Sequence, residues 1–250
     1  IEALRAMISM AATGDGSTGE DPSQDRVMMI MDVSRAFFYA PVNKATYVEL
    51  PPEEGLDNQK FCGRLNFSLY GTREAPQNWH RTYSQQLVDI GFAKGKSSPC
   101  IFFHKQRKIP VLVHGDDYVV TGRRKDMKWL EEEVRKKFKI KVEYLGPRAD
   151  DKQEIRILNR ILRYGSHGFE YEADPRHSEI IVDELGLGKA NGISTPGAKD
   201  THKTAEDDAE ATPQEATRYR AICARINFLA LDRPDLLYAA KECSRKMANP

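Results

Sequence analysis

Val111-Leu112-Val113-His114-Gly115-Asp116-Asp117-Tyr118-Val119-Val120-Thr121-Gly122 is the stretch that decides the fold, because two runs rich in β-branched residues meet there at Gly-Asp-Asp. Valine and tyrosine favour strands, whereas glycine and aspartate favour turns. The stretch therefore predicts a tight β-hairpin with the carboxylates of Asp116 and Asp117 at its tip. Aspartate is also common in turns for backbone reasons alone, so the tip by itself does not separate a structural turn from a catalytic pair.

A third carboxylate, Asp32, lies near the end of another apolar run, Val-Met-Met-Ile-Met-Asp-Val over residues 27–33. This run is continuous rather than alternating, which predicts a fully buried strand. If the strand lies beside the hairpin, Asp32, Asp116 and Asp117 converge on an oxygen-rich site suited to magnesium, especially with substrate phosphates as further ligands. The alternative is that Asp32 caps a helix starting near Ser34. Both interpretations stay open at this point.

Composition excludes some classes of protein. The 250 residues include 38 basic and 37 acidic side chains, for a net charge of +1, so any nucleic-acid surface must be local. No apolar run approaches the length of a membrane span, and the chain opens on a helical pattern rather than a signal peptide. The cysteines lack zinc-like spacing, and we expect reduced thiols in an intracellular protein. They are Cys62, Cys100, Cys223 and Cys243.

The order of predicted elements indicates an α+β fold, with an antiparallel sheet backed by helices. A helix is expected over 1–12, a loose loop over 13–25, short strands over 45–50 and 60–65, a helix from the 71–79 loop to Ile90, strands over 100–104 and 109–111, and an amphipathic helix over 123–140. Further along, strands are expected over 154–164 and 168–172, a helix over 177–185, and helical structure over 219–247 interrupted at Pro234.

A series of blocks along the chain resembles, in the same order, the reverse transcriptases of copia-type retrotransposons. Residues 31–38 are similar to the block D-V-x-x-A-F, 51–55 to Q-P-x-G-F, 68–79 to S-L-Y-G-L-K-Q-A-P-R-x-W, and 114–117 to Y-V-D-D. The resemblance continues at Leu145-Gly146, Thr195-Pro196, 233–239 and Ser244-Arg245. It covers nearly the whole chain, and the shared order makes it specific.

The resemblance implies a right-hand polymerase fold. Residues 1–145 would form partial fingers and the palm, 146–196 a thumb or connection-like region, 197–215 a flexible linker, and 216–250 a C-terminal helical segment. A ribonuclease H domain follows this segment in the family, and we expect that domain and the N-terminal finger strands to be absent from this chain.

The implied activity is RNA-directed DNA synthesis by two-metal nucleotidyl transfer within a Pol polyprotein. Asp32 and Asp116 would be the principal ligands of two magnesium ions, with manganese as an alternative, and Asp117 a supporting ligand. The implied partners are an RNA template, a DNA primer, deoxynucleoside triphosphates, and the integrase and ribonuclease H of the full polyprotein, with no membrane. The implied location is a cytoplasmic particle or the nucleus.

Four residues match substrate-binding positions of the family. Phe37 matches an aromatic position that excludes a 2′-hydroxyl, although core packing is an alternative role. Tyr70 and Gly71 match a loop that contacts nucleotide and template. Arg73 stands where the family has lysine, and a solvated charge is the alternative.

Two basic clusters are candidates for phosphate contacts. The first is Arg123, Arg124 and Lys125, directly after the hairpin. The second lies along the expected amphipathic helix, where the neighbouring glutamates 131–133 favour a solvated face instead; it consists of Arg135, Lys136, Lys137, Lys139 and Lys141.

The chain also departs from the family. His114 and Gly115 replace an aromatic and an apolar residue, and 38–41 replace an L-N-G segment. A second hypothesis is therefore a catalytically inactive retrotransposon remnant that keeps a nucleic-acid-binding fold. A third is a palm-like hydrolase or cyclase, which the block over 68–79 disfavours because it has no evident role there.

Overall fold

The computed structural model describes residues 2–13, 26–54, 60–195, 197 and 210–250. Residues 14–25 of the predicted loop and 198–209 of the predicted linker lie outside this description, as do Gly55 and Pro196 of the family-like blocks. The chain divides into two compact units. An N-terminal unit contains residues 1–153 and 164–169, and a C-terminal unit contains 154–163 and 170–250.

A six-stranded sheet organises the described part of the N-terminal unit, in the order β4-β5-β6-β7-β1-β8, and neighbouring strands are antiparallel. The predicted hairpin is confirmed as β6 and β7, which pair from Val111↔Val120 to His114↔Asp117. The predicted strand over 27–33 is confirmed as β1, which lies between β7 and β8. The bounds are β1 (Arg26–Val33), β4 (Ala93–Lys94), β5 (Ile101–His104), β6 (Ile109–His114), β7 (Asp117–Arg123) and β8 (Ile140–Leu145).

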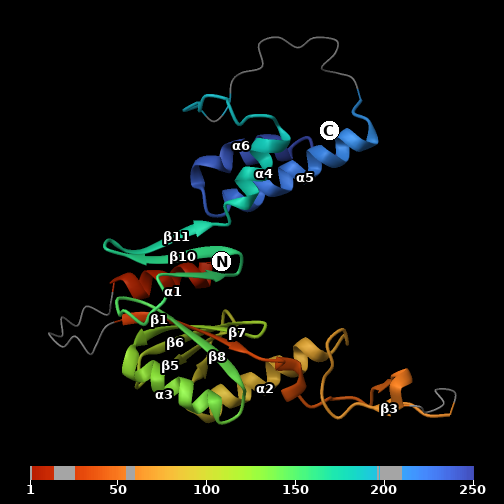
Figure 1. Cartoon of the computed structure of the whole chain (residues 1–250), viewed down its shortest axis with the longest axis vertical. Helices are drawn as coiled ribbons and strands as arrows, with labels where there is room; N and C mark the ends of the chain where they lie inside the picture. Colours follow the sequence, from red (N-terminus) through yellow and green to blue (C-terminus); the bar gives the residue numbers. More distant parts are fainter. Residues whose placement is uncertain (1, 14–25, 55–59, 196, 198–209) are drawn as a thin grey trace. The chain divides into compact units, whose positions relative to one another are not determined.

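Helices cover both faces of this sheet, which explains why β1 is apolar without alternation. Figure 1 shows α2 (Ala75–Asp89) and α3 (Arg124–Arg135) on one face and α1 (Glu2–Thr13) on the other. Alternate residues of β1 enter the core beneath α2 and α3, together with side chains of those helices. They are Val27, Met29, Met31 and Val33 from β1, Trp79, Tyr83 and Leu87 from α2, and Met127, Leu130 and Val134 from α3.

The helix predicted over 123–140 is shorter in the structure. α3 ends at Arg135, and Ile140–Leu145 forms the edge strand β8 beside β1. Lys141 and Glu143 alternate with the apolar Ile140 and Val142, which is a strand pattern, and pairing with β1 decides the conformation. The second basic cluster is therefore divided between a helix end, a turn and a strand.

The segment between β1 and α2 contains little regular structure in its described residues, and Figure 1 shows it extending from the sheet. The strands predicted over 45–50 and 60–65 shrink to the paired β2 (Tyr47–Val48) and β3 (Gly63–Arg64). Two short 3-10 helices complete it, η2 (Ala36–Tyr39) and η3 (Pro52–Glu54).

Most of a three-stranded sheet and a group of helices form the C-terminal unit, while residues 164–169, which include the end of β10 and the start of β11, are counted in the N-terminal unit. The strands are β9 (Glu154–Ile157), β10 (Arg160–Gly165) and β11 (Gly168–Ala173), and the helical elements are α4 (Arg176–Glu184), α5 (Pro213–Ala230), η5 (Pro234–Leu236) and α6 (Leu237–Ser244). α5 begins inside the stretch predicted to be a linker, because Thr212 and Glu215 form a capping box that starts the helix there. The predicted break at Pro234 is confirmed.

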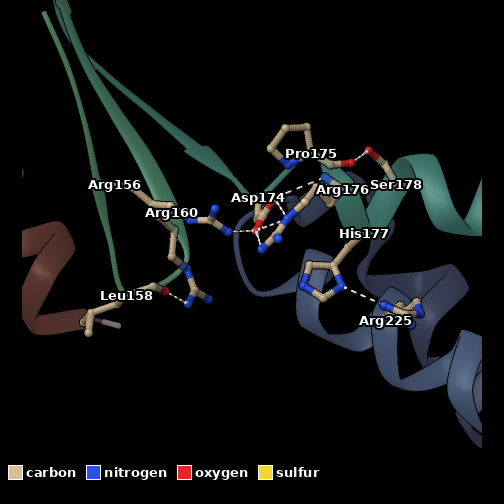
Figure 2. Close-up of polar contacts among 9 residues, drawn as sticks. All are labelled: Arg156, Leu158, Arg160, Asp174, Pro175, Arg176, His177, Ser178 and Arg225. Carbon is tan, nitrogen blue, oxygen red and sulfur yellow. Dashed lines mark hydrogen bonds and ion pairs between the residues drawn. The ribbon is translucent and has the colours of Figure 1, made fainter.

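Arginine–aspartate contacts hold the strands and helices of the C-terminal unit together. Figure 2 shows the carboxylate of Asp174 receiving the guanidinium groups of Arg156 and Arg176, while Arg225 contacts the His177 ring. Hydrogen bonds from Arg176 lower the pKa of Asp174 to about 2. None of the helices in the described residues has the length and apolar character needed to cross a bilayer.

A buried ion pair fixes the start of α3 in the N-terminal unit. Arg124 and Asp151 are paired with side chains only 5% and 2% exposed, and the Arg124 guanidinium also lies 5.0 Å from the centre of the Tyr144 ring. The Asp151 carboxylate accepts a further hydrogen bond from the Arg148 backbone. Gly146 is required beside it, because an added Cβ would lie 2.5 Å from a methyl carbon of Val27 and 2.9 Å from an Asp151 oxygen.

We expect Asp151→Ala to lower the free energy of unfolding by about 3–5 kcal/mol, because it leaves the Arg124 charge buried without a partner. Urea unfolding followed by circular dichroism measures this loss. Lys136→Ala is the control, because Lys136 is 65% exposed and its pair with Glu133 should contribute less than about 1 kcal/mol. Equal losses in the two variants would contradict the prediction.

Candidate metal centre

The β6–β7 turn places two aspartates at the end of the sheet. Gly115 adopts φ +64°, a left-handed conformation that glycine accepts at low cost. The Gly115 carbonyl accepts a hydrogen bond from Nε1 of the buried Trp79 at 2.7 Å, and the Asp116 carbonyl accepts one from the Val33 backbone at 3.0 Å. The turn that carries the aspartates is thus held by α2 on one side and by β1 on the other.

The third carboxylate meets them across the sheet. Asp32 on β1 lies directly opposite Asp117 on β7. Each of Asp32, Asp116 and Asp117 offers one carboxylate oxygen, and these oxygens all lie within 4.8 Å of one another. The helix-capping alternative for Asp32 is not borne out, because η2 has Arg35 at its N-cap and receives no side-chain hydrogen bond there. The predicted convergence of the three carboxylates is confirmed.

Three acids this close repel one another unless a cation lies between them. Partial burial raises the pKa of Asp117, and the neighbouring charges of Asp116 and Asp32 raise it further, while His114 opposes them. Asp116 is exposed and the other two are half-buried, so an ion can reach the oxygens. An all-oxygen donor set of this kind fits a hard divalent cation such as magnesium.

A basic side chain lies beside the three carboxylates on each neighbouring strand, β6 and β8. The register places His114 of β6 opposite Asp117, Asp117 opposite Asp32, and Asp32 opposite Lys141 of β8. An open hollow of about 510 Å³ is lined by Lys141 together with Ile30, Asp32, Val142 and Glu143. Sequence analysis placed Lys141 along a helix and so missed its position beside Asp32. The alternation of apolar and charged residues over 140–145 was the available signal.

The predicted substrate-binding residues form an aromatic group next to an exposed turn. The ring centres of Phe37 and Tyr70 lie 4.5 Å apart. The Phe38 ring meets the Tyr70 ring edge-on, with 5.6 Å between the ring centres. Phe37 also packs against the core, so its core-packing role is present, whereas Tyr70 is 47% exposed. Gly71 has φ +88° with open space around it, and Arg73 is exposed.

The predicted phosphate contacts lie elsewhere in the N-terminal unit. Asp117 begins β7 and Arg123 ends it, so the two are about 20 Å apart at ~3.3 Å per residue. Arg124 is buried in its ion pair with Asp151, so its guanidinium is not exposed to the phosphates of a nucleic acid. Lys125 is exposed in the first turn of α3. The structure therefore does not bring this cluster to the three carboxylates.

Comparison with known proteins gives the family. A family model described as reverse transcriptase (RNA-dependent DNA polymerase) matches residues 21–196. The chain belongs to this reverse transcriptase family. The match contains β1, the β6–β7 hairpin and all three carboxylates.

Curated relatives of this reverse transcriptase are polyproteins of transposons. The chain is 25% identical over 260 residues to the retrovirus-related Pol polyprotein from transposon TNT 1-94 of Nicotiana tabacum, covering 99% of the chain and 18% of the relative. It is 25% identical to the corresponding polyprotein from transposon RE2 of Arabidopsis thaliana, covering 88% and 15%. It is 26% identical to the transposon Ty1-JR2 Gag-Pol polyprotein of Saccharomyces cerevisiae, covering 83% and 12%. The predicted resemblance to copia-type retrotransposon reverse transcriptases is confirmed.

Among solved structures, that of apo telomerase from Candida tropicalis has a TM-score of 0.48 and 9% identity, covering 99% of this chain and 45% of that one. This likeness is too weak to add to the family assignment.

We expect Asp117→Asn to stabilise the metal-free protein at pH 7 by about 0.5–1 kcal/mol. Because the pKa of Asp117 is raised on folding, the folded state holds its proton more tightly than the unfolded chain, and stability falls as pH rises from the ordinary value of 3.8 through the raised pKa. The gain should therefore shrink as pH is lowered toward 3.8. Chemical unfolding in EDTA measures this gain in the free energy of unfolding. Asp150→Asn is the control, because Asp150 is exposed. A pH-independent gain would refute this account.

Trp79→Phe should lower the free energy of unfolding by about 1–3 kcal/mol, because the Gly115 carbonyl loses its donor and the smaller ring leaves a cavity. It should also weaken the stabilisation by added magnesium, since the turn carrying Asp116 and Asp117 is less well held. Thermal unfolding with and without magnesium tests both effects. Leu87→Ala is the control, because it removes core volume beneath the same helix without touching the turn. The prediction fails if both variants keep the full magnesium response.

Proposed function

We propose that this reverse transcriptase chain carries the palm of an RNA-directed DNA polymerase from a copia-type Pol polyprotein. The single observation that supports the proposal most is the meeting of Asp32, Asp116 and Asp117 at one end of an antiparallel sheet backed by helices. The chain spans 18% or less of the length of the polyproteins compared above, so the activity of a whole Pol protein is part of this proposal.

The proposed metal ligands are the three carboxylates, with Asp32 and Asp116 as the principal ones and Asp117 in support. Two magnesium ions, or manganese in their place, would activate the primer 3′-hydroxyl and neutralise charge on the triphosphate and its leaving group. The β1–β7 register holds Asp32 opposite Asp117, and the Trp79 and Val33 contacts hold the turn. The carboxylates are thus positioned before any substrate arrives.

The proposed substrates are deoxynucleoside triphosphates, an RNA template and a DNA primer. Lys141 faces the hollow beside Asp32, where a cation would attract substrate phosphates. The exposed Tyr70 ring, with Gly71 and Arg73 after it, would contact nucleotide and template, and Phe37 beneath Tyr70 would limit space near the 2′ position. Gly71 leaves room for close approach, since nothing lies within 4 Å of where its side chain would be.

The proposed division of the chain follows from the family resemblance of the sequence. The six-stranded sheet with α2 and α3 would be the palm, the segment with β2 and β3 part of the fingers, residues 146–196 a thumb or connection-like region, and 216–250 the helical segment before ribonuclease H. The remainder of the polyprotein, including integrase, would be a partner. A cytoplasmic particle or the nucleus would be the place of action.

His114 and Gly115, which differ from the residues of the family, are the reason to consider the alternative hypothesis of an inactive remnant. Gly115 is accommodated in this turn, because its positive φ suits glycine and its carbonyl is hydrogen-bonded. His114 remains paired in register with Asp117. The local geometry therefore favours an intact site over a remnant.

Primer extension tests the proposal. We expect the chain to extend oligo(dT) on poly(rA) with dTTP and magnesium, and Asp116→Asn to reduce extension at least about 100-fold, because it removes a ligand charge at the reacting phosphates. Asp150→Asn, an exposed acid away from the three carboxylates, is the matched control and should extend normally. Template–primer binding without synthesis, by protein shown to be folded, would instead identify the remnant.

A further inference from the structure

A second hollow in the N-terminal unit has an unusual lining. It measures about 380 Å³ and is formed where the turn between β5 and β6 approaches the junction of β7 and α3. All of its lining side chains are polar or charged. They are Gln106, Arg107, Lys108, Arg123, Lys125 and Asp126. We call this site the basic hollow.

Positive charge dominates the basic hollow, with four cations and one carboxylate in a chain whose net charge is only +1. The carboxylate of Asp126 is already engaged, because it accepts a hydrogen bond from Arg107 at 2.9 Å. The Arg107 guanidinium is also stacked 3.9 Å from the centre of the Trp129 ring. One cation is therefore held in a fixed orientation, and a planar guanidinium with several donors is well suited to oxyanions.

The first turn of α3 adds to the positive charge of the basic hollow. Arg123 occupies its N-cap position and makes no side-chain capping hydrogen bond. The backbone N–H groups of a helix start carry partial positive charge, so they reinforce the neighbouring cations. Lys125 extends from this turn and is exposed to solvent.

We propose that the basic hollow binds phosphate groups, either in the backbone of a nucleic-acid strand or in a free di- or triphosphate. The three carboxylates lie at one end of the β6–β7 hairpin and the basic hollow lies at the other end, about 20 Å from Asp117. It is thus a site separate from the proposed polymerase centre, and its ligand does not depend on catalysis. Sequence analysis nominated Arg123 and Lys125 here, and the structure adds Gln106, Arg107 and Lys108.

Binding measurements in EDTA test the proposal apart from the metal centre and from polymerase activity. One arm follows the anisotropy of fluorescein-labelled oligo(dT) from about 50 to 200 mM salt, and the other follows sodium pyrophosphate by calorimetry. The test variant is Lys108→Gln/Lys125→Gln. The control is Lys189→Gln/Lys246→Gln, which removes the same charge from exposed positions of the C-terminal unit, outside both basic clusters. Lys108→Arg/Lys125→Arg keeps the charge.

We expect the test variant to bind at least about tenfold more weakly, with the salt slope for oligo(dT) reduced by about 1.4 for two lost phosphate contacts. The control and the arginine variant should stay near the parent chain. A loss confined to oligo(dT) identifies a nucleic-acid backbone as the ligand, and a matching loss for pyrophosphate identifies a free phosphate compound. If the folded test variant and the control bind alike in both arms, the proposal is overturned.

Discussion

The register between β1 and β7 is the constraint on which the candidate metal centre depends. It places Asp32 opposite Asp117, and the adjacent turn then brings Asp116 to the same point. A shift of one residue would turn every side chain of β1 to the other face of the sheet. Met29 and Met31 are fully buried beneath α2 and α3, so a shift would exchange them with Asp32 and its neighbours. The core therefore fixes the position of the acid.

Burial on both faces of β1 has a second consequence. Since α1 covers part of one face, a carboxylate is tolerated on β1 only near its end, where Asp32 is half-buried and the hollow beside Lys141 is open. Partial burial, and after it the neighbouring charges of Asp116 and Asp32, raise the pKa of Asp117. A site that is electrostatically unfavourable when empty is one that a divalent cation stabilises.

Much of this arrangement could be predicted from sequence because its signals are local. β-branched runs around Gly-Asp-Asp specify the hairpin, and a continuous apolar run specifies β1. What could not be predicted depended on distant partners. β8 follows α3 so closely that its pattern merged with the helix, and only pairing with β1 separates them. Arg124 has the sequence surroundings of a surface cation, and only its pairing with Asp151, far along the chain, buries it. Charged residues carry no local sign of such a partner.

The β6–β7 hairpin has opposite charge at its two ends, with three carboxylates at the tip and four cations around the basic hollow. The Debye length is about 10 Å at 0.1 M ionic strength, and the ends are about 20 Å apart, so each end acts on its surroundings nearly independently. A polyanion is then repelled by the bare tip while it is attracted to the base. Divalent ions bound at the tip would reverse the sign of the local charge there and leave the charge around the basic hollow unchanged. The length of the strands thus keeps the candidate metal centre and the proposed phosphate site electrostatically separate on one small hairpin.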